Sequence, residues 1–320
     1  MFTIIIPLYN KSNYLVKTIQ SIVKQTFQEF ELIIIDDGST DDSLEQLRLI
    51  SDKLRHSHPV FFDKLRVFEQ DNQGVSTTRN RGISLAKYEY IAFLDADDWW
   101  EPTFLQEMVE LINEFPNAGI YGSSYFKVKN VKRERANIGV EPAFQSGIIN
   151  YFECYAKTLW MPLWTGAVIV PKKVLVEFCG FKKELKLGED FYLWTQIAGK
   201  YPVILLNRAL SNYNQDVEIQ HRAVGEKFYL PSEHVIYQDF SFLEGNKHFK
   251  ILFDRLAVYA LLPYYIENIN LHEARKIISS INWKNVNRKY FYNYKVLPKF
   301  IVVVWFKLRV ILSRINRLSI

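Results

Sequence analysis

The sequence contains few cysteines, and they form no metal-site pattern. Only Cys154 and Cys179 occur among 320 residues, and their spacing matches no zinc motif. This scarcity argues against a disulfide framework, and we expect two buried free thiols in a reducing compartment.

Long apolar runs are also missing. The first residues, MFTIIIPLYN, have no basic segment ahead of a short apolar run, so we do not expect a secretory signal peptide. No stretch of 18 consecutive apolar residues occurs, so we expect no membrane-spanning helix.

Acidic residues are absent from the C-terminal part of the chain. Residues 274–320 contain 11 Lys and Arg but no Asp or Glu, whereas residues 1–273 contain 29 Lys and Arg and 35 Asp and Glu. The net charge of +5 therefore combines a mildly acidic body with a basic tail. Such a tail indicates a polyanionic partner, either nucleic acid or anionic lipid.

Glycine-rich phosphate-binding motifs are missing as well. Neither of the first two apolar runs is followed by G-x-G-x-x-G or a Walker motif, which argues against a dehydrogenase and an ATPase. A nucleotidyltransferase that makes an activated sugar remains an alternative, although PLYNKSNY, after the first run, has no glycine.

The residues that are present predict an α/β fold. Continuous apolar strands alternate with helical periodicity, which is typical of a mostly parallel central sheet flanked by helices. Ser12 is expected to cap the first helix, and residues 127–142 to form an exposed loop. The expected strands are 2–6, 31–35, 65–70, 90–95 and 165–171, and the expected helices begin near residues 12, 44, 75, 102 and 188.

Polar clusters follow the first four strands, at residues 7–10, 36–39, 72–74 and 95–98. In open α/β sheets, ligands bind at the carboxyl ends of the strands. We therefore expect the four clusters to form one site.

The last cluster has the chemistry of a metal site. Asp95 and Asp97 are expected to alternate along an extended segment, and paired carboxylates with phosphate oxygens are the usual ligands of Mg²⁺ or Mn²⁺. The alternative is a solvated turn. Asp98 is expected to orient the loop or to cap the next helix. Asp36 or Asp37 can accept a hydrogen bond from a pyrimidine N–H, or merely cap a helix.

Five motifs in a fixed order carry a family resemblance. TIIIPLYN, IIIDDGSTDDS, DNQGVSTTRNRGI, YIAFLDADDWW and a later GED resemble the family 2 glycosyltransferases, closely over residues 1–125 and more loosely over 160–215. The resemblance implies a GT-A fold, a nucleotide-sugar donor, a divalent metal and inversion at the anomeric carbon.

The resemblance also implies roles for single residues. Asp97 would coordinate the metal on the donor diphosphate, Asp95 would contact the metal or the ribose, and Asp36 or Asp37 would meet the uracil of a UDP-sugar. The other implied donor-binding residues are Pro7, Tyr9, Asn10, Asn72, Gly74 and Arg79.

Asp190, with Glu189 beside it in GED, would be the general base. An acceptor hydroxyl must lose its proton as it attacks, so a positioned carboxylate is needed. The alternative is a helix start with acidic residues at its positive end. His221 would be either a third metal ligand or an ordinary surface or core histidine.

The Q-x-x-R-W motif of processive synthases is missing after Asp190. This favours transfer of one sugar to a glycan or lipid-linked acceptor of bacterial surface polysaccharide, such as lipopolysaccharide or capsule. Trp160 and Trp164 would stack on the acceptor or pack in the core. A non-catalytic, membrane-bound sugar-binding protein is a further alternative.

We expect a catalytic domain over residues 1–220, with a nucleotide-sugar half (1–125) and an acceptor half (126–220), and a helical extension over 221–320. In the tail, apolar and basic residues separate onto two helical faces. Residues 296–320 would therefore lie on an anionic membrane surface, or dock on their own domain. This predicts a cytoplasmic protein, peripheral at the inner face of the cytoplasmic membrane, with no nucleic-acid partner. The apolar face would comprise Leu308, Ile311, Leu312 and Ile315, with Trp305 at its flank, and the basic face Lys299, Lys307, Arg314 and Arg317.

Overall fold

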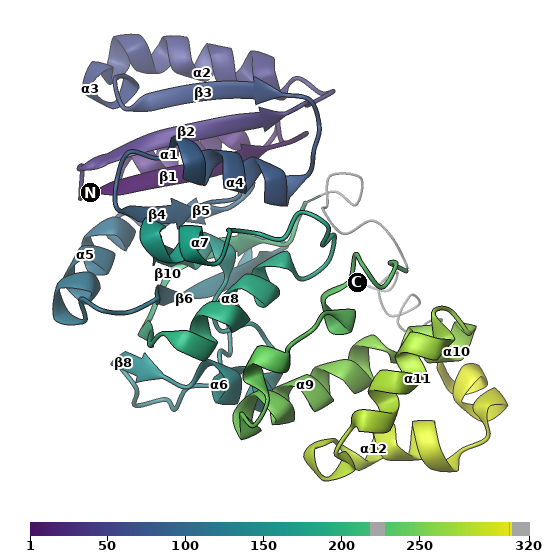
Figure 1. The fold of residues 1–320 in the computed structure, drawn as a ribbon. Helices are drawn as coiled ribbons and strands as arrows, with labels where there is room; N and C mark the ends of the chain where they lie inside the picture. Colours follow the sequence, from purple (N-terminus) through teal and green to yellow (C-terminus); the bar gives the residue numbers. More distant parts are fainter. Residues whose placement is uncertain (218–227, 307, 309–320) are drawn as a thin grey trace. The chain divides into compact units, whose positions relative to one another are not determined.

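A computed structural model describes residues 1–217, 228–306 and 308. The chain divides into two compact units, Met1–Gly225 and Glu226–Ile320 (Figure 1). Each unit has its own hydrophobic core.

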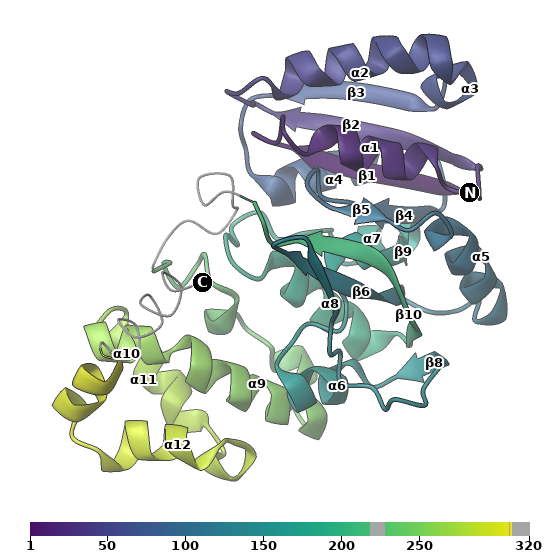
Figure 2. The ribbon, with the colours of Figure 1, turned by 180° about the vertical axis from the view of Figure 1, so that it is seen from behind.

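The N-terminal unit is built on a mixed sheet, in which ten strands are found over the described residues. Their order is β3-β2-β1-β4-β9-β6-β10-β5, with β7 paired to β6 and β8 to β10 (Figures 1 and 2). The strands are β1 Phe2–Leu8, β2 Phe30–Asp37, β3 Leu65–Gln70, β4 Tyr90–Phe93, β5 Trp99–Trp100, β6 Ile120–Lys129, β7 Lys132–Arg135, β8 Ser146–Ile149, β9 Val168–Pro171 and β10 Val203–Asn214.

The first half of the sheet is parallel. β1 pairs in parallel with β2 and β4, and β2 with β3, so the carboxyl ends of these four strands share one edge. β9 runs antiparallel between β4 and β6 and joins this half to the second. The predicted α/β fold class is confirmed, and the antiparallel pairs of the second half make the sheet mixed.

Helices cover both faces of the sheet. α1, α2 and α5 bury apolar side chains against the face that carries Ile4 and Ile6, whereas α4 lies against Ile5 on the opposite face. The helices of this unit are α1 Leu15–Val23, α2 Ser43–Ser57, α3 Pro59–Phe62, α4 Val75–Leu85, α5 Phe104–Glu114, α6 Tyr151–Thr158, α7 Lys172–Glu177 and α8 Glu189–Lys200, with a 3-10 turn η1 Thr165–Ala167.

Three local predictions were wrong. Residues 127–142 do not form a loop throughout, because β6 and β7 pair as a hairpin whose charged β7 side chains are all exposed. Ser12 does not cap α1, which begins at Leu15; the Ser12 N–H is instead bonded to Asp41 Oδ2 at 3.2 Å. Cys154 is buried as predicted, but Cys179 is exposed, in the turn after α7.

The C-terminal unit is helical. Val258, Leu262, Ala274 and Val302 come from different helices and meet in its core. None of the helices in the described residues is both long and apolar enough to cross a bilayer. They are α9 Lys247–Ala260, α10 Leu262–Glu267, α11 Leu271–Ser280 and α12 Arg288–Phe291, with short turns η3 Val235–Tyr237, η4 Ser241–Leu243 and η5 Trp283–Asn285 and a π-helical turn η6 Tyr292–Val296; residues 299–306 are also helical.

The close approach of α4 to β1 gives a stability prediction. A Cβ atom at Gly82 would lie 2.5 Å from Ile5 Cγ2, in the fully buried core. Gly82→Ala gains about 1 kcal/mol of helix propensity, but overpacking a rigid core costs about 1–3 kcal/mol. Because Ile5 is β-branched and enclosed, we expect net destabilisation, measured as a lower urea midpoint. Ser84→Ala, on the exposed side of the same helix, is the control; equal midpoints for the two variants would contradict the packing argument.

Candidate functional site

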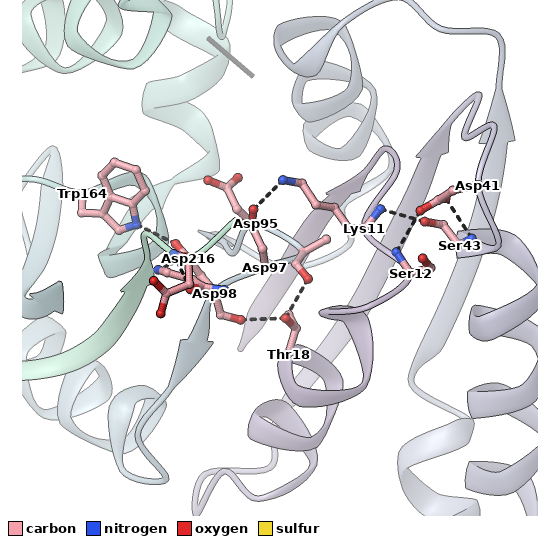
Figure 3. A network of polar contacts seen from close by, with 12 residues as sticks. Lys11, Ser12, Thr18, Asp41, Ser43, Asp95, Asp97, Asp98, Trp164 and Asp216 are labelled. Atoms are coloured by element: carbon pink, nitrogen blue, oxygen red, sulfur yellow. Dashed lines mark hydrogen bonds and ion pairs between the residues drawn. The ribbon is translucent and has the colours of Figure 1, made fainter. Parts of the chain in front are cut away.

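The segment after β4 is a turn and not the predicted extended strand end. The Asp98 N–H donates to the Asp95 carbonyl oxygen at 3.0 Å. The Thr18 hydroxyl of α1 lies 2.9 Å from the carbonyl oxygen of Ala96 and 2.7 Å from that of Asp98 (Figure 3). One side chain of α1 therefore fixes the turn that presents Asp95 and Asp97.

Asp98 holds the surrounding elements together. Its Oδ1 accepts a hydrogen bond from the Asn214 N–H and its Oδ2 accepts one from Trp164 Nε1, both at 2.8 Å. Burial raises the pKa of Asp98 well above its usual range, and the charges of Asp97 and Asp95 add to the effect. Since both oxygens are used, Asp98 orients the loop, which is the first of its two predicted roles.

Asp97 is paired with a lysine that the sequence did not single out. Lys11 Nζ lies 2.5 Å from Asp97 Oδ2, and both side chains are largely enclosed (Figure 3). Burial raises the pKa of Asp97, with Lys11 opposing this effect and Asp95 adding to it. Lys11 follows directly after the YN of the first motif, but only the fold brings it to Asp97.

Arg79 of α4 joins two carboxylates from distant parts of the unit. Its Nη2 lies 2.8 Å from Asp95 Oδ1 and its Nη1 lies 3.1 Å from Glu189 Oε1. Burial works against the charge of Arg79, but Asp95 and Glu189 outweigh it and raise the pKa of the guanidinium. The Arg79 side chain is only 5% exposed, so its guanidinium is a buried positive charge that balances these two carboxylates.

Glu189 and Asp190 begin α8 directly after Gly188, and they point to different partners. Glu189 is held by Arg79, whereas Asp190 Oδ2 accepts from the Thr165 hydroxyl at 3.1 Å. Burial raises the pKa of Glu189 to about 7, with the charge of Asp190 adding and Arg79 opposing. Burial also raises the pKa of Asp190, with Arg79 opposing.

The two carboxylates at the end of β2 have different environments. Asp37 Oδ1 accepts from Gln70 Nε2 at 2.7 Å and from the Gln73 N–H at 2.9 Å, and its Oδ2 accepts from the Gly74 N–H at 2.8 Å. Asp36 Oδ2 accepts from the N–H groups of Gly38 and Ser39, at 3.1 and 3.0 Å. Within the described residues, Asp36 Oδ1 is buried without a hydrogen-bond partner. Asp37 therefore holds the loop before α4, and Asp36 retains a free acceptor.

Asn10 ties the end of β1 to the end of β2. Its N–H donates to Ser39 Oγ at 3.1 Å, and its Oδ1 accepts from the Thr40 N–H at 2.8 Å. Tyr9 is 44% exposed at the same edge. The same edge of the sheet also holds the other predicted donor-binding residues. Pro7 lies near the end of β1, and Asn72 and Gly74 follow β3.

A cavity of about 420 Å³ lies beside Asp97. Trp99 and Lys17 line it, and Lys17 Nζ lies 3.0 Å from the centroid of the Trp99 ring. The predicted acceptor residues Trp160 and Trp164 are not among its lining residues. Trp164 instead bonds Asp98 and packs on Tyr213, with ring centroids 3.9 Å apart.

The carboxylate oxygens at this turn are suitable ligands for a divalent cation that binds together with a phosphate group. Among the described residues no three His, Cys, Asp or Glu side chains are grouped as a complete metal site, and His221 lies outside those residues. Mg²⁺ and Mn²⁺ commonly use one or two protein carboxylates and take the remaining oxygens from substrate and water. Asp97 and Asp95 match that requirement, and burial, with the charge of neighbouring carboxylates, raises the pKa of Asp97 and of Asp98.

Solved structures with this fold define the class. The chain superposes on a Staphylococcus aureus TarS fragment, residues 1–349 in complex with UDP-GlcNAc, with a TM-score of 0.60 and 21% identity, over 92% of this chain and 76% of that one. It also superposes on the mannosyltransferase PcManGT from Pyrobaculum calidifontis in complex with GDP-Man and Mn²⁺, with a TM-score of 0.53 and 16% identity, over 97% and 80% of the two chains. The fold is thus GT-A, as predicted.

The sequence places the chain in a family within that class. The model of glycosyl transferase family 2 matches residues 3–162, so the chain belongs to this family. An uncharacterized glycosyltransferase of Rickettsia felis is 32% identical over 212 residues, which are 65% of this chain and 32% of the relative. The chain thus spans about a third of the length of that relative.

The contrast between Asp36 and Asp37 predicts a difference in stability. Asp37→Asn places an amide N–H₂ against N–H donors that now meet carboxylate oxygens, and a lost buried hydrogen bond of this kind costs about 1–3 kcal/mol. Asp36→Asn can keep its one used oxygen as an acceptor. We expect a lower thermal midpoint for Asp37→Asn than for Asp36→Asn by scanning calorimetry. The reverse order would assign the structural role to Asp36.

Proposed function

We propose that this protein is an inverting, metal-dependent glycosyltransferase that moves one sugar from a UDP-sugar to a glycan or lipid-linked acceptor of bacterial surface polysaccharide, such as lipopolysaccharide or capsule. The observation that carries the proposal is the carboxylate cluster at one edge of a GT-A sheet, formed by Asp95, Asp97, Glu189 and Asp190 around Arg79. In this proposal residues 1–220 catalyse transfer and residues 221–320 form the extension.

The parallel half of the sheet would bind the donor. Asp36 has a buried acceptor oxygen without a partner, and a base N–H that reached it would recover the cost of leaving it unpaired. Tyr9, exposed at the same edge, offers a ring face beside it. TarS was solved with UDP-GlcNAc and PcManGT with GDP-Man. A direct comparison of UDP and GDP binding would therefore identify the nucleobase that this protein prefers.

Asp97 and Asp95 would hold Mn²⁺ or Mg²⁺. A divalent cation, when bound there, supplies positive charge that stabilises the leaving diphosphate. Arg79 keeps Asp95 in place from below, and Lys11 supplies a second positive charge at the same edge. His221, which lies outside the described residues, remains a proposed third ligand.

Asp190 is the proposed general base. The Thr165 hydroxyl fixes Asp190 Oδ2, and the ion pair with Arg79 engages Glu189. Asp190 accepts hydrogen bonds from the neutral Thr165 hydroxyl and Phe191 N–H, whereas Glu189 is paired with the charged Arg79. We therefore assign the proton of an acceptor hydroxyl to Asp190 and the positioning of Arg79 to Glu189. Trp160 and Trp164 remain proposed acceptor contacts; Trp164 would act from its anchored position on Asp98.

The C-terminal unit would bind an anionic membrane surface at the inner face of the cytoplasmic membrane. Phe300, Val304 and Leu308, in the segment whose helix begins at residue 299, follow a four-residue spacing, and each is more than half exposed. On the same segment Val302 is buried in the core, so the exposed residues form an outward stripe. The basic residues of 274–320 would add about 1 kcal/mol each where they lie near anionic lipid. Lys299, however, bonds Asn268 of its own unit, and Ile311, Leu312, Ile315, Lys307, Arg314 and Arg317 lie outside the described residues.

The proposed reaction predicts that release of UDP depends on a divalent metal and on Asp190. We expect turnover of a UDP-sugar with Mn²⁺, loss of turnover with EDTA, and a fall in kcat of about 10²–10⁴-fold in Asp190→Asn. Burial raises the pKa of Asp190 above its usual range, so this base becomes protonated at a higher pH than an ordinary aspartate does, and kcat should fall as the pH is lowered. Released UDP is the measurement.

Donor binding by calorimetry separates chemistry from recognition. Asp190→Asn should bind UDP and Mn²⁺ as the unchanged protein does. Normal turnover without metal would remove the metal assignment. Donor binding without turnover on any glycan acceptor would favour a non-catalytic sugar-binding protein.

The outward stripe predicts membrane binding that depends on its apolar residues. Phe300→Glu with Val304→Glu should reduce flotation with vesicles that contain anionic lipid, because both side chains would leave the bilayer interface. Tyr259→Glu, at a position 67% exposed in the same unit, is the control. Equal flotation of the two proteins would assign the stripe another partner.

A further inference from the structure

Lys11 lies on a segment that is fixed along its backbone. The Lys11 N–H donates to Ser43 Oγ at 2.8 Å, and the neighbouring Ser12 N–H donates to Asp41 Oδ2 at 3.2 Å (Figure 3). Asn10, at a φ of 51°, is bonded to Ser39 and Thr40. The loop after β2 therefore sets where the Lys11 side chain begins.

The Lys11 ammonium occupies the oxygen that a metal would need. Lys11 Nζ lies 2.5 Å from Asp97 Oδ2, with the two side chains 15% and 14% exposed. An ion pair this enclosed is less screened by water than a surface pair, so it competes effectively with other cations. Asp97 also lines the cavity beside the turn, as does Asp216.

We propose that Lys11 is an internal counter-ion that competes with the divalent cation for Asp97. The inference rests on the proposed function, because it concerns the same metal site. Lys11 neutralises Asp97 in the free protein and gives up this oxygen when metal and nucleotide bind together. Its ammonium then faces the donor diphosphate, so Lys11 lowers the affinity for metal alone and raises the affinity for nucleotide.

Metal binding without catalysis tests this competition. Free Mn²⁺ is titrated by electron paramagnetic resonance, with and without UDP, into the full chain and its variants. We expect Lys11→Met to bind Mn²⁺ alone about tenfold more tightly, and to bind UDP in the presence of Mn²⁺ several-fold more weakly. Lys24 is exposed directly after α1 and serves as the control position. Lys24→Met also removes one positive charge and should leave both affinities unchanged.

Two further variants keep the test decisive. Lys11→Arg retains the charge, so its affinities for Mn²⁺ and UDP should be closer to those of the unchanged protein than the affinities of Lys11→Met are. This variant controls for a general loss of structure at position 11. Asp97→Asn should abolish the effect of Lys11→Met. If Mn²⁺ binds but Lys11→Met and Lys24→Met behave alike, the inference is overturned and the proposed function stands. If no variant binds Mn²⁺ even with UDP, the metal assignment fails together with the inference.

Discussion

Arg79 carries a buried positive charge between two carboxylates of this site and offsets their repulsion. Its guanidinium bonds Asp95, which follows β4, and Glu189, which begins α8. Without a partner, each enclosed carboxylate would cost free energy to ionise, as the raised pKa of Glu189 already shows. Arg79 comes from α4, which is packed on β1, so the parallel strands and α8 are linked through one side chain.

The acidic residues at the strand ends divide into two kinds. Asp37 and Asp98 spend both carboxylate oxygens on hydrogen bonds that hold loops, including the main-chain N–H groups of Gly74 and Asn214. Asp97, by contrast, is ion-paired within the described residues with Lys11, which another cation can replace. The aspartate-rich motifs thus contain some residues that hold the loops in place and others whose oxygens remain available to a ligand.

The sequence predicted the parallel half of the fold because β1 and β2 are continuous apolar runs, which are buried on both faces. It missed the β6–β7 hairpin, since an edge strand of four exposed charged residues looks like a loop. The turn after β4 was read as extended because the hydroxyl that fixes it, on Thr18, comes from a distant helix. The family resemblance implied roles for Asp97 and Asp190, whereas their partners Lys11 and Thr165 are adjacent to them only in the fold.

Charge balance favours a cation beside the carboxylates at this edge of the sheet. Burial, with the charge of Asp95, raises the pKa of Asp97, Asp98 and Asp190, and Glu189 adjoins Asp190. Arg79 and Lys11 are the cations bonded to this group of carboxylates in the described residues. Burial favours protonation of some carboxyls, which reduces this excess but removes ligands and the base. A divalent cation reduces it while keeping them ionised. In the proposed function a nucleotide diphosphate would add negative charge at the same place, so metal and donor would each bind better in the presence of the other.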